Sequence, residues 1–285
     1  MQRATWIDLA ALALLLSVSA PAYAQSVAMI TDVTGKVTAP GAKAALTILS
    51  EIELDARLHL DAGARLVAIY LKSGDEYSVT GPAQVQFRSD GLHGLSGGTP
   101  VKQAGPMAKA GADLRIKSAS VTQAAFVMRA IRTTGRITLL ALSGTKILDA
   151  SPEFRWQAAE PDLTYRFELK DEDAKTLIAA DVNGTSFTLP ASIRLVDDAA
   201  YRWDVSARSA DGHLHAGAGV FTVATAALRS EVETLRPPQD APVSARVAFA
   251  AWLAQSELRD EARKYWKVLA AERPDDARLK SLAGE

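Results

Sequence analysis

The chain has 285 residues, a formal net charge of −1 at pH 7 and no cysteine. The missing thiol excludes disulfide bonds, a cysteine nucleophile, thiolate metal sites and a lipoprotein anchored through a cysteine. Balanced charge without a basic stripe argues against a surface that follows nucleic-acid phosphates. The length allows two small domains or one large one.

The N-terminus has the layout of a secretory signal peptide. Arg3 precedes an apolar run from Leu9 to Val18, Pro21 breaks the segment, and Ala22-Tyr23-Ala24 offers small residues to a signal peptidase. The apolar run is about half of the roughly 20 residues that a membrane-spanning helix needs. We therefore expect residues 1–24 to be removed and the protein to be periplasmic or secreted, with no retained membrane span.

Residues 25–100 predict an all-β domain of short strands. In the stretch LVAIYLKSGDEYSVTGPAQVQF, which begins at Leu66, both alternating faces of the first strand are apolar. We therefore expect that strand to lie between two layers. Gly74 suits the positive φ of a tight turn, so Ser73-Gly74-Asp75 is interpreted as a bend and not as a site. Gly81-Pro82 marks the next corner.

This region resembles the FecR-type β domain of bacterial envelope proteins. The resemblance covers roughly residues 27–100 and is carried by turn residues: a small-residue corner at 61–64, Ser73-Gly74 and Gly81-Pro82. In the best-known members this domain passes a transport signal to a sigma factor. The resemblance therefore implies an envelope protein with a role in signalling.

Residues 101–148 are left as an extension of the first domain or a linker to the next. The segments GADLRIKSASVTQAAFVMRAI and RITLLALSGTKIL suit further strands or a short helix. Both alternatives stay open for Val121 to Ile131.

Residues 149–225 predict a β-sandwich. Short alternating strands recur at regular spacing, and Asn183-Gly184 and Asp211-Gly212 predict hairpin turns. The region resembles a fibronectin type III or immunoglobulin-like sandwich. Pro152 with Trp156 matches the first strands of that fold, and Tyr201-Arg202-Trp203 matches a late strand.

Residues 226–285 predict a helical tail with a short α-helical hairpin. Small residues such as Ala250 and Ala262 fall on helical faces together with Trp266, and Pro274 ends the second helix. The pattern resembles one tetratricopeptide unit. Because such arrays normally need about three repeats, we expect this unit to pack on the sandwich or on a partner.

Three patterns invite a catalytic or metal-binding interpretation. Gly94-Leu95-Ser96-Gly97-Gly98 matches the G-x-S-x-G nucleophile elbow, but prolines follow where a helix should start. His213-Leu214-His215 offers two metal ligands and lacks a third, so exposed hairpin histidines are favoured. The acids at 171–173 and 197–198 are interpreted as solvated turn residues rather than a calcium site.

Four aromatic residues of the third region offer either a glycan platform or a core stripe. They alternate with charged residues, which favours the core. The four are Trp156, Tyr165, Tyr201 and Trp203.

Taken together, the sequence predicts a mainly β, exported, non-enzymatic protein that binds or scaffolds partners in the bacterial envelope. We expect its contacts with a protein partner around Trp252, Tyr265 and Trp266 of the helical tail, and no cofactor or metal. A core role for either tryptophan stays open. The alternative functions are a cell-wall or polysaccharide binder and, more remotely, a serine hydrolase using Ser96.

Overall fold

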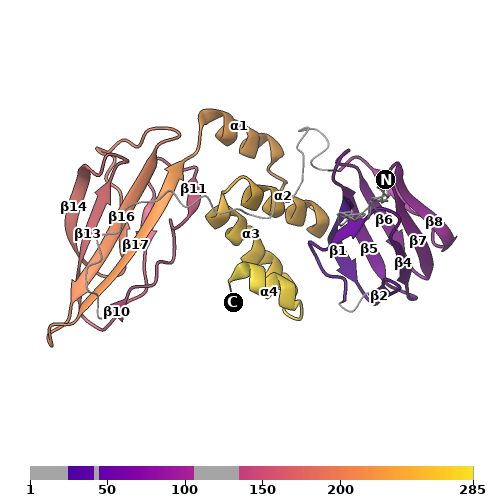
Figure 1. Cartoon of the computed structure of the whole chain (residues 1–285), viewed down its shortest axis with the longest axis horizontal. Coiled ribbons are helices and arrows are strands. Elements are labelled where there is room, and N and C mark those ends of the chain that lie inside the picture. The colour runs from indigo at the N-terminus through magenta and orange to yellow at the C-terminus, as the bar shows by residue number, and fades with distance from the viewer. Residues whose placement is uncertain (1–24, 42–44, 106–134, 285) are drawn as a thin grey trace, which may run out of the picture.

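The structure is a computed structural model, and it describes residues 25–41, 45–105 and 135–284. The expected signal peptide and the segment from Val121 to Ile131 lie outside these residues. The described chain forms two β domains with helices between them (Figure 1). It is mainly β, as predicted. None of its helices combines the length and the apolar character needed to cross a bilayer.

The first β domain consists of two antiparallel sheets. One sheet has the strand order β3-β1-β5-β6-β9 and the other has the order β2-β4-β7-β8. Their facing sides enclose one apolar core. The strands are β1 Ser26–Thr34, β2 Val37–Thr38, β3 Glu51–Glu53, β4 Arg57–Leu60, β5 Arg65–Tyr70, β6 Glu76–Thr80, β7 Ala83–Arg88, β8 Gly91–Gly97 and β9 Val101–Gln103.

Strand β5 is buried on both faces, as the sequence predicted. Leu66, Ala68 and Tyr70 point into the core between the two sheets. Ile69 points the other way, into a second apolar cluster that is formed mostly by helices. The two layers around β5 are therefore the opposite sheet and the helices near the C-terminus.

The turns of this domain follow the sequence prediction. The hairpin from β5 to β6 turns at Ser73-Gly74-Asp75, with Gly74 at a φ of 71°. The amide of Gly74 donates to the carbonyl of Tyr70 at 2.8 Å. The corner at Gly81-Pro82 carries the chain from β6 into β7 of the other sheet. Ser73-Gly74-Asp75 is thus a bend.

The second β domain is a sandwich of unequal sheets. Its larger sheet has the order β10-β17-β16-β13-β14, with β11 also paired to β17, and its smaller sheet contains β12 and β15. The aromatic core lies between these two sheets. The strands are β10 Gly135–Arg136, β11 Thr145–Ile147, β12 Glu153–Arg155, β13 Thr164–Lys170, β14 Thr176–Asn183, β15 Ser186–Thr188, β16 Ala200–Arg208 and β17 Leu214–Val223.

Of the two hairpins predicted in the sandwich, the structure contains one, and the prediction of a hairpin at Asn183-Gly184 is wrong. Asp211-Gly212 joins β16 and β17, which pair antiparallel as expected. Asn183-Gly184 joins β14 to β15, but β15 pairs with β12 in the other sheet. The Asn-Gly turn therefore carries the chain across the sandwich, where Phe187 pairs with Phe154 of β12 and stacks on Phe167 at 4.4 Å between ring centroids. Such tertiary packing overrides a two-residue turn signal.

The segment that the sequence left open is divided between the two β domains. Strand β9, at 101–103, pairs with β6 and extends the first domain. Strands β10 and β11 pair with β17 and belong to the sandwich. Within the described residues, strand pairing therefore assigns residues 101–103 to the first domain and residues 135–136 and 145–147 to the second.

Four helices follow the sandwich in the described chain, where the sequence predicted a hairpin. Helices α2 and α3 form that hairpin, and Pro274 follows α3 as expected. Thr225 caps α1 by accepting from the amide of Leu228, and Asp276 caps α4. The helices are α1 Ala226–Leu235, α2 Val243–Gln255, α3 Arg259–Glu272 and α4 Ala277–Ala283.

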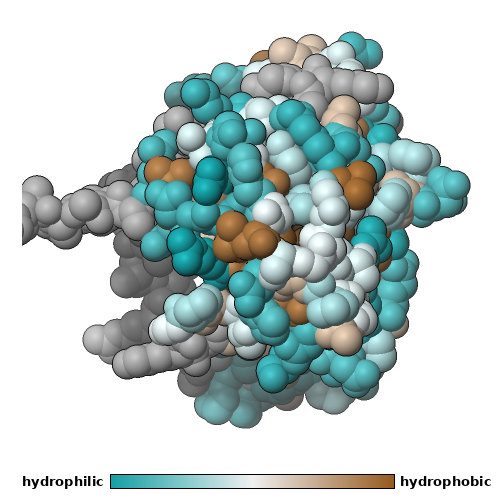
Figure 2. Space-filling view, turned by 90° about the vertical axis from the view of Figure 1, so that its right-hand side faces the viewer, coloured by the Kyte–Doolittle hydropathy of each residue, from teal (hydrophilic) through white to brown (hydrophobic). Residues whose placement is uncertain are grey.

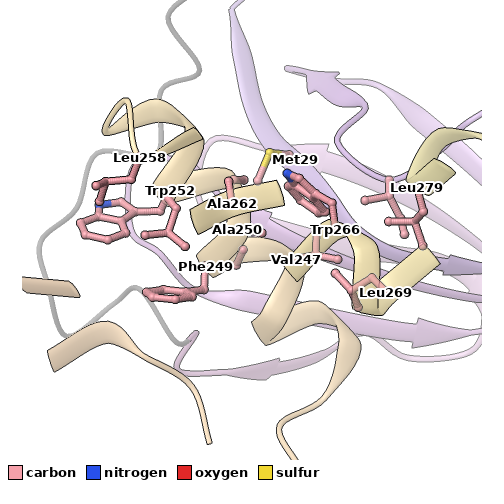
Figure 3. Packing of buried hydrophobic residues seen from close by; sticks show 14 of the residues in the cluster. Met29, Val247, Phe249, Ala250, Trp252, Leu258, Ala262, Trp266, Leu269 and Leu279 are labelled. Atoms are coloured by element: carbon pink, nitrogen blue, oxygen red, sulfur yellow. The ribbon is translucent and has the colours of Figure 1, made fainter. Parts of the chain in front are cut away.

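Helices α2, α3 and α4, called the helical unit below, pack against the first β domain through an apolar interface. Met29 of β1 and Ile69 of β5 share one buried cluster with Val247 and Trp266. Figure 3 shows Met29 reaching from the sheet toward Trp266, between the helices. At the edge of this interface, Arg273 donates to Asp32 at 2.7 Å. We call this contact the apolar joint.

The helical unit meets the sandwich mainly through hydrogen bonds, and Leu148, which follows β11, is a partly buried apolar residue that packs against the cluster of the helices. The amide of Leu142 donates to Asp260 Oδ2 at 2.7 Å, and the amide of Lys146 donates to the Glu257 carbonyl at 2.8 Å. The Thr145 hydroxyl donates to the same Glu257 carbonyl at 3.2 Å. We call this contact the polar joint.

Candidate functional site

The three residues predicted for partner contact lie mostly inside the helical unit. Trp252 is 5% exposed and Trp266 is 3% exposed. Phe249 stacks on Trp252 with ring centroids 5.8 Å apart and meets Tyr265 edge-on at 5.1 Å. Tyr265 alone is partly exposed. The structure therefore places both indoles in the core, which was the alternative that the sequence left open.

The G-x-S-x-G motif lies in a strand. Ser96 belongs to β8 and faces Gln84 of β7. The chain then enters β9, so no helix follows the serine in this part of the described chain. The elbow mechanism needs a strand, a strained turn and a helix, and this arrangement does not supply them.

The two histidines have different partners. His213 is exposed in the hairpin turn and lies 3.1 Å from Asp211. The prediction of an exposed side chain is wrong for His215, which is 13% exposed and lies 2.9 Å from Glu160. Gly135 of β10 packs against its ring so closely that an added Cβ would lie 2.3 Å from Nδ1. Among the described residues, no group of three or more potential ligands could hold a metal ion.

The paired acids lie in turns, as predicted. Asp171 accepts from the amide of Lys175 at 2.9 Å within the turn from β13 to β14. Asp197 pairs with Arg229 of α1, and the hydrogen bond from this guanidinium holds the pKa of Asp197 below its usual value. Both carboxylates are thus occupied by structural contacts.

The four aromatic residues of the sandwich form its core and not a platform. Each has an exposed fraction of 4% or less. The indole N–H of Trp203 donates to the carbonyl of Leu142 at 2.8 Å. Gly219 makes room for this bond, since an added Cβ would lie 2.5 Å from Trp203 Nε1. This hydrogen bond links the sandwich core to the polar joint.

The outer end of the first β domain offers no continuous apolar surface in the view of Figure 2. That view shows hydrophilic atoms over most of the face, with separate hydrophobic patches. Leu54 and Leu95 are the strongly exposed leucines of this domain. Isolated exposed leucines are normal on soluble proteins and mark no binding site.

A groove lies at the polar joint, between the sandwich and α3. It consists of two adjoining hollows of about 450 Å³ and about 390 Å³, which share several lining residues. Its walls come from the 139–142 segment and β12 of the sandwich, from α3, and from Gly284 at the end of α4. We call this feature the junction groove.

The backbone around Leu142 shapes one wall of the junction groove. Leu142 has a φ of 56°, in the left-handed region that leucine rarely adopts. Its amide is held by Asp260 and its carbonyl by Trp203, so contacts on both sides fix this conformation. Leu140, two residues earlier, is left 47% exposed at the groove.

The charges of the junction groove are partly paired. Arg263 lies 2.7 Å from Asp260, Lys264 lies 2.7 Å from Glu261, and Lys146 lies 3.0 Å from Glu257. Arg155 of β12 and Lys267 of α3 line both hollows and make no ion pair within the described residues. Arg155 thus belongs to the sandwich and Lys267 to the helical unit.

This arrangement is suited to recognition. The lining residues offer guanidinium and ammonium donors, the carboxylates of Asp149, Glu153, Asp260 and Glu261, one exposed leucine and backbone groups, and include no histidine or cysteine. Asp260, the carboxylate at the centre, already accepts from Leu142 and Arg263. Such groups can bind an anion and an apolar side chain, but they include no free base next to a nucleophile.

The junction groove was not predicted from the sequence. The i, i+4 spacing of Arg263 and Lys267 could have indicated a cationic stripe on α3. Arg155 alternates with the core residues Phe154 and Trp156 and could have been assigned to the surface. Only the packing of α3 on the sandwich brings these side chains to one groove.

The comparisons with known proteins give only weak fold similarities. No protein-family model matches the chain, and no curated protein matches it. Among solved structures, CopC from Methylosinus trichosporium OB3b is 19% identical, covers 32% of this chain and 95% of its own, and has a TM-score of 0.26. Fibronectin(III)-like modules of Clostridium thermocellum CbhA are 12% identical, cover 32% of this chain and 98% of their own, and have a TM-score of 0.23.

A segment of two fibronectin type III domains from chicken tenascin is 11% identical. It covers 71% of this chain and 87% of its own, with a TM-score of 0.24. All these TM-scores are low, so the assignment of a sandwich rests on the strand pairing of the chain itself.

Proposed function

We propose that this chain is an exported, non-enzymatic binding or scaffold protein of the bacterial envelope, which contacts a partner protein through the junction groove. In this proposal the first β domain and the helical unit form one body. The sandwich is joined to that body at the polar joint, where the partner binds.

One observation supports this proposal above others. The junction groove brings Arg155 of the sandwich and Lys267 of the helical unit to the same hollow, without a carboxylate partner among the described residues. The affinity of a binding surface formed by two parts of a chain depends on how those two parts are positioned relative to each other. A partner bound there would fix the sandwich against the helical unit, which is a suitable property for a scaffold.

The family resemblances agree with this role. FecR-type and tetratricopeptide-like units are the finer assignments that we propose for the first β domain and for α2 with α3. The turns at Ser73-Gly74 and Gly81-Pro82 support the former. The close packing of α2 and α3 around Ala250 and Ala262, both 1% exposed or less, supports the latter. The signal-like residues 1–24 support export.

Photo-crosslinking in the living host tests the proposal. A benzophenone amino acid is placed at Ser143 or at Lys264, which line the groove, and at Lys175 as a control in an exposed turn of the sandwich. We expect one dominant protein adduct from the groove positions and none from the control. Mass spectrometry then identifies the partner.

Two results would contradict the proposal. Adducts of equal yield from Ser143 and Lys175 would mean that the groove has no special affinity for proteins. Labelling of Ser96 in the folded protein by a fluorophosphonate probe would indicate an enzyme instead.

A further inference from the structure

The smaller hollow of the junction groove is cationic. Arg155, Arg263 and Lys267 line it together with a single carboxylate, Asp260. Both oxygens of that carboxylate are engaged, one by the Leu142 amide and the other by Arg263. Arg155 and Lys267 therefore remain without a carboxylate within the described part of the chain.

The two cations are held at the groove by well-packed backbones. Arg155 lies between Phe154 and Trp156, which are 1% exposed or less. Lys267 follows Trp266, which is buried in the helical unit. Like charges held near each other repel, and an anion bound between them relieves this repulsion. An arginine can also bind a carboxylate through two parallel hydrogen bonds.

The outer face of the sandwich shows the opposite arrangement. Arg202 lies 2.7 Å from Asp204, and Lys170 lies 2.9 Å from Glu168 and 3.6 Å from Asp204. The cations of this network are thus neutralised by carboxylates of their own strand and, for Lys170, of the neighbouring strand as well. Among the described residues, the lining of the smaller hollow includes no carboxylate besides Asp260, so a negative charge supplied from outside would complement Arg155 and Lys267.

An apolar group lies beside the cations. The amide of Leu140 donates to the carbonyl of Arg155 at 2.9 Å, so these two residues are neighbours across the strands. The Leu140 side chain is 47% exposed at the hollow. A peptide that carries both a carboxylate and an apolar side chain matches this pairing better than a bare anion does.

We infer that the smaller hollow of the junction groove binds an acidic, leucine-type segment of the partner protein, whose carboxylates are recognised by Arg155 and Lys267 and whose apolar side chain packs on Leu140. This inference rests on the proposed function, because it names the chemistry of the partner that binds there. The groove is formed only where the sandwich and α3 meet, so recognition depends on both.

Fluorescence anisotropy with synthetic peptide pools tests the inference on the chain from residue 25 to residue 285. The pools have equal length and equal leucine content, and their polar positions are all glutamate, all glutamine or all lysine. We expect the glutamate pool to bind at least about tenfold more tightly than the glutamine pool. We also expect this preference to weaken as ionic strength rises, because the cations are exposed.

Matched charge reversals locate the binding. The variant R155E/K267E should lose the preference for the glutamate pool. The control variant K72E/K175E has the same change in net charge, placed in exposed turns of both β domains, and should keep the preference. Unchanged circular dichroism and unfolding midpoints establish that both variants fold.

Each alternative outcome has a distinct meaning. Equal binding of the glutamate and glutamine pools, or equal effects of the two variants, overturns the inference. Preferential binding of polygalacturonate to the groove also overturns it, in favour of an anionic polysaccharide. If Ser143 crosslinks to a partner through a neutral or basic peptide, the inference fails while the proposed function stands. If no groove position gives a protein adduct, the proposed function itself fails.

Discussion

The helical unit is joined to the two β domains by interfaces of opposite character. At the apolar joint, Met29 and Ile69 share a dry, buried cluster with Trp266. At the polar joint, Asp260 and backbone groups make the contacts, and a groove opens beside them. Burial of apolar area stabilises a contact far more than a few hydrogen bonds that water could replace.

From this difference we expect two cooperative units. We expect the first β domain and the helical unit to fold and unfold together, although the whole sandwich separates them in the sequence. The sandwich has its own core, and we expect its contact with the helical unit to be weaker than the apolar joint. Surfaces that recognise partners are drawn from the less stable parts of a protein, and the junction groove lies at such a place.

The largest expected effect on the free energy of unfolding comes from removing the indole of Trp266, which the helical unit and the first β domain share. Trp266→Ala should lower the free energy of unfolding by about 3 to 5 kcal/mol, because it empties a volume that helices and sheet fill together. Hydrogen exchange should show lost protection in β1 and β5 as well as in α2. Trp203→Ala is the matched control, since it removes a buried indole of the sandwich and should affect β13 and β16. Lost protection in the helices alone after Trp266→Ala would contradict a shared unit.

The apolar joint also shows what the sequence can and cannot predict. Two apolar faces on β5 indicated a strand between two layers, because residue alternation is a local property. The identity of the second layer was not predictable, since Ile69 and Trp266 lie almost two hundred positions apart. The same limit applies to the site. Trp252 and Trp266 were recognisable as residues of the tail, but their burial and the meeting of Arg155 with Lys267 depend on tertiary packing.

The ion pair at the edge of the apolar joint gives the next largest effect. Asp32→Ala should destabilise the protein by about 2 kcal/mol, because it leaves the Arg273 guanidinium without its partner in a partly buried place. The cost stays below that of a fully buried pair, since Arg273 is 24% exposed. Chemical denaturation measures it. In the double variant D32L/R273M, apolar packing should recover most of the loss, and failure to do so would mean that the charges themselves specify the joint.

A substitution at the polar joint should cost less free energy, and it should change the orientation of the sandwich and not the stability of the first β domain. Asp260→Ala removes the acceptor of the Leu142 amide and should cost about 1 to 2 kcal/mol of the contact between α3 and the sandwich. Small-angle X-ray scattering should report a wider range of domain orientations, while the unfolding midpoint of the first β domain stays the same. Glu261→Ala is the control, because its partner Lys264 is exposed and such pairs contribute little. A cooperative loss of the whole fold in Asp260→Ala would show that both joints belong to one unit.

The smallest expected effect on stability comes from an ion pair inside the helical unit, between α2 and α3. Arg246 of α2 donates to both carboxylate oxygens of Glu272 of α3, at 2.6 and 2.7 Å. These hydrogen bonds hold the pKa of Glu272 below its usual value of 4.5. Glu272 is 44% exposed, so solvent screening limits the contribution of the pair to less than about 1 kcal/mol.

The sign of the pH dependence follows from the lowered pKa. A carboxylate whose pKa is lower in the folded state stabilises the protein above its unfolded pKa, and this stabilisation is lost as the pH falls through the folded value. The stability difference between wild type and Glu272→Gln should therefore be present at neutral pH and vanish in acid below about pH 4.5. Urea denaturation across this range measures it. Because the pair joins α2 to α3, the change should leave hydrogen exchange at β11 unaltered, and altered exchange there would mean that the helical unit and the sandwich are coupled more tightly than the polar joint implies.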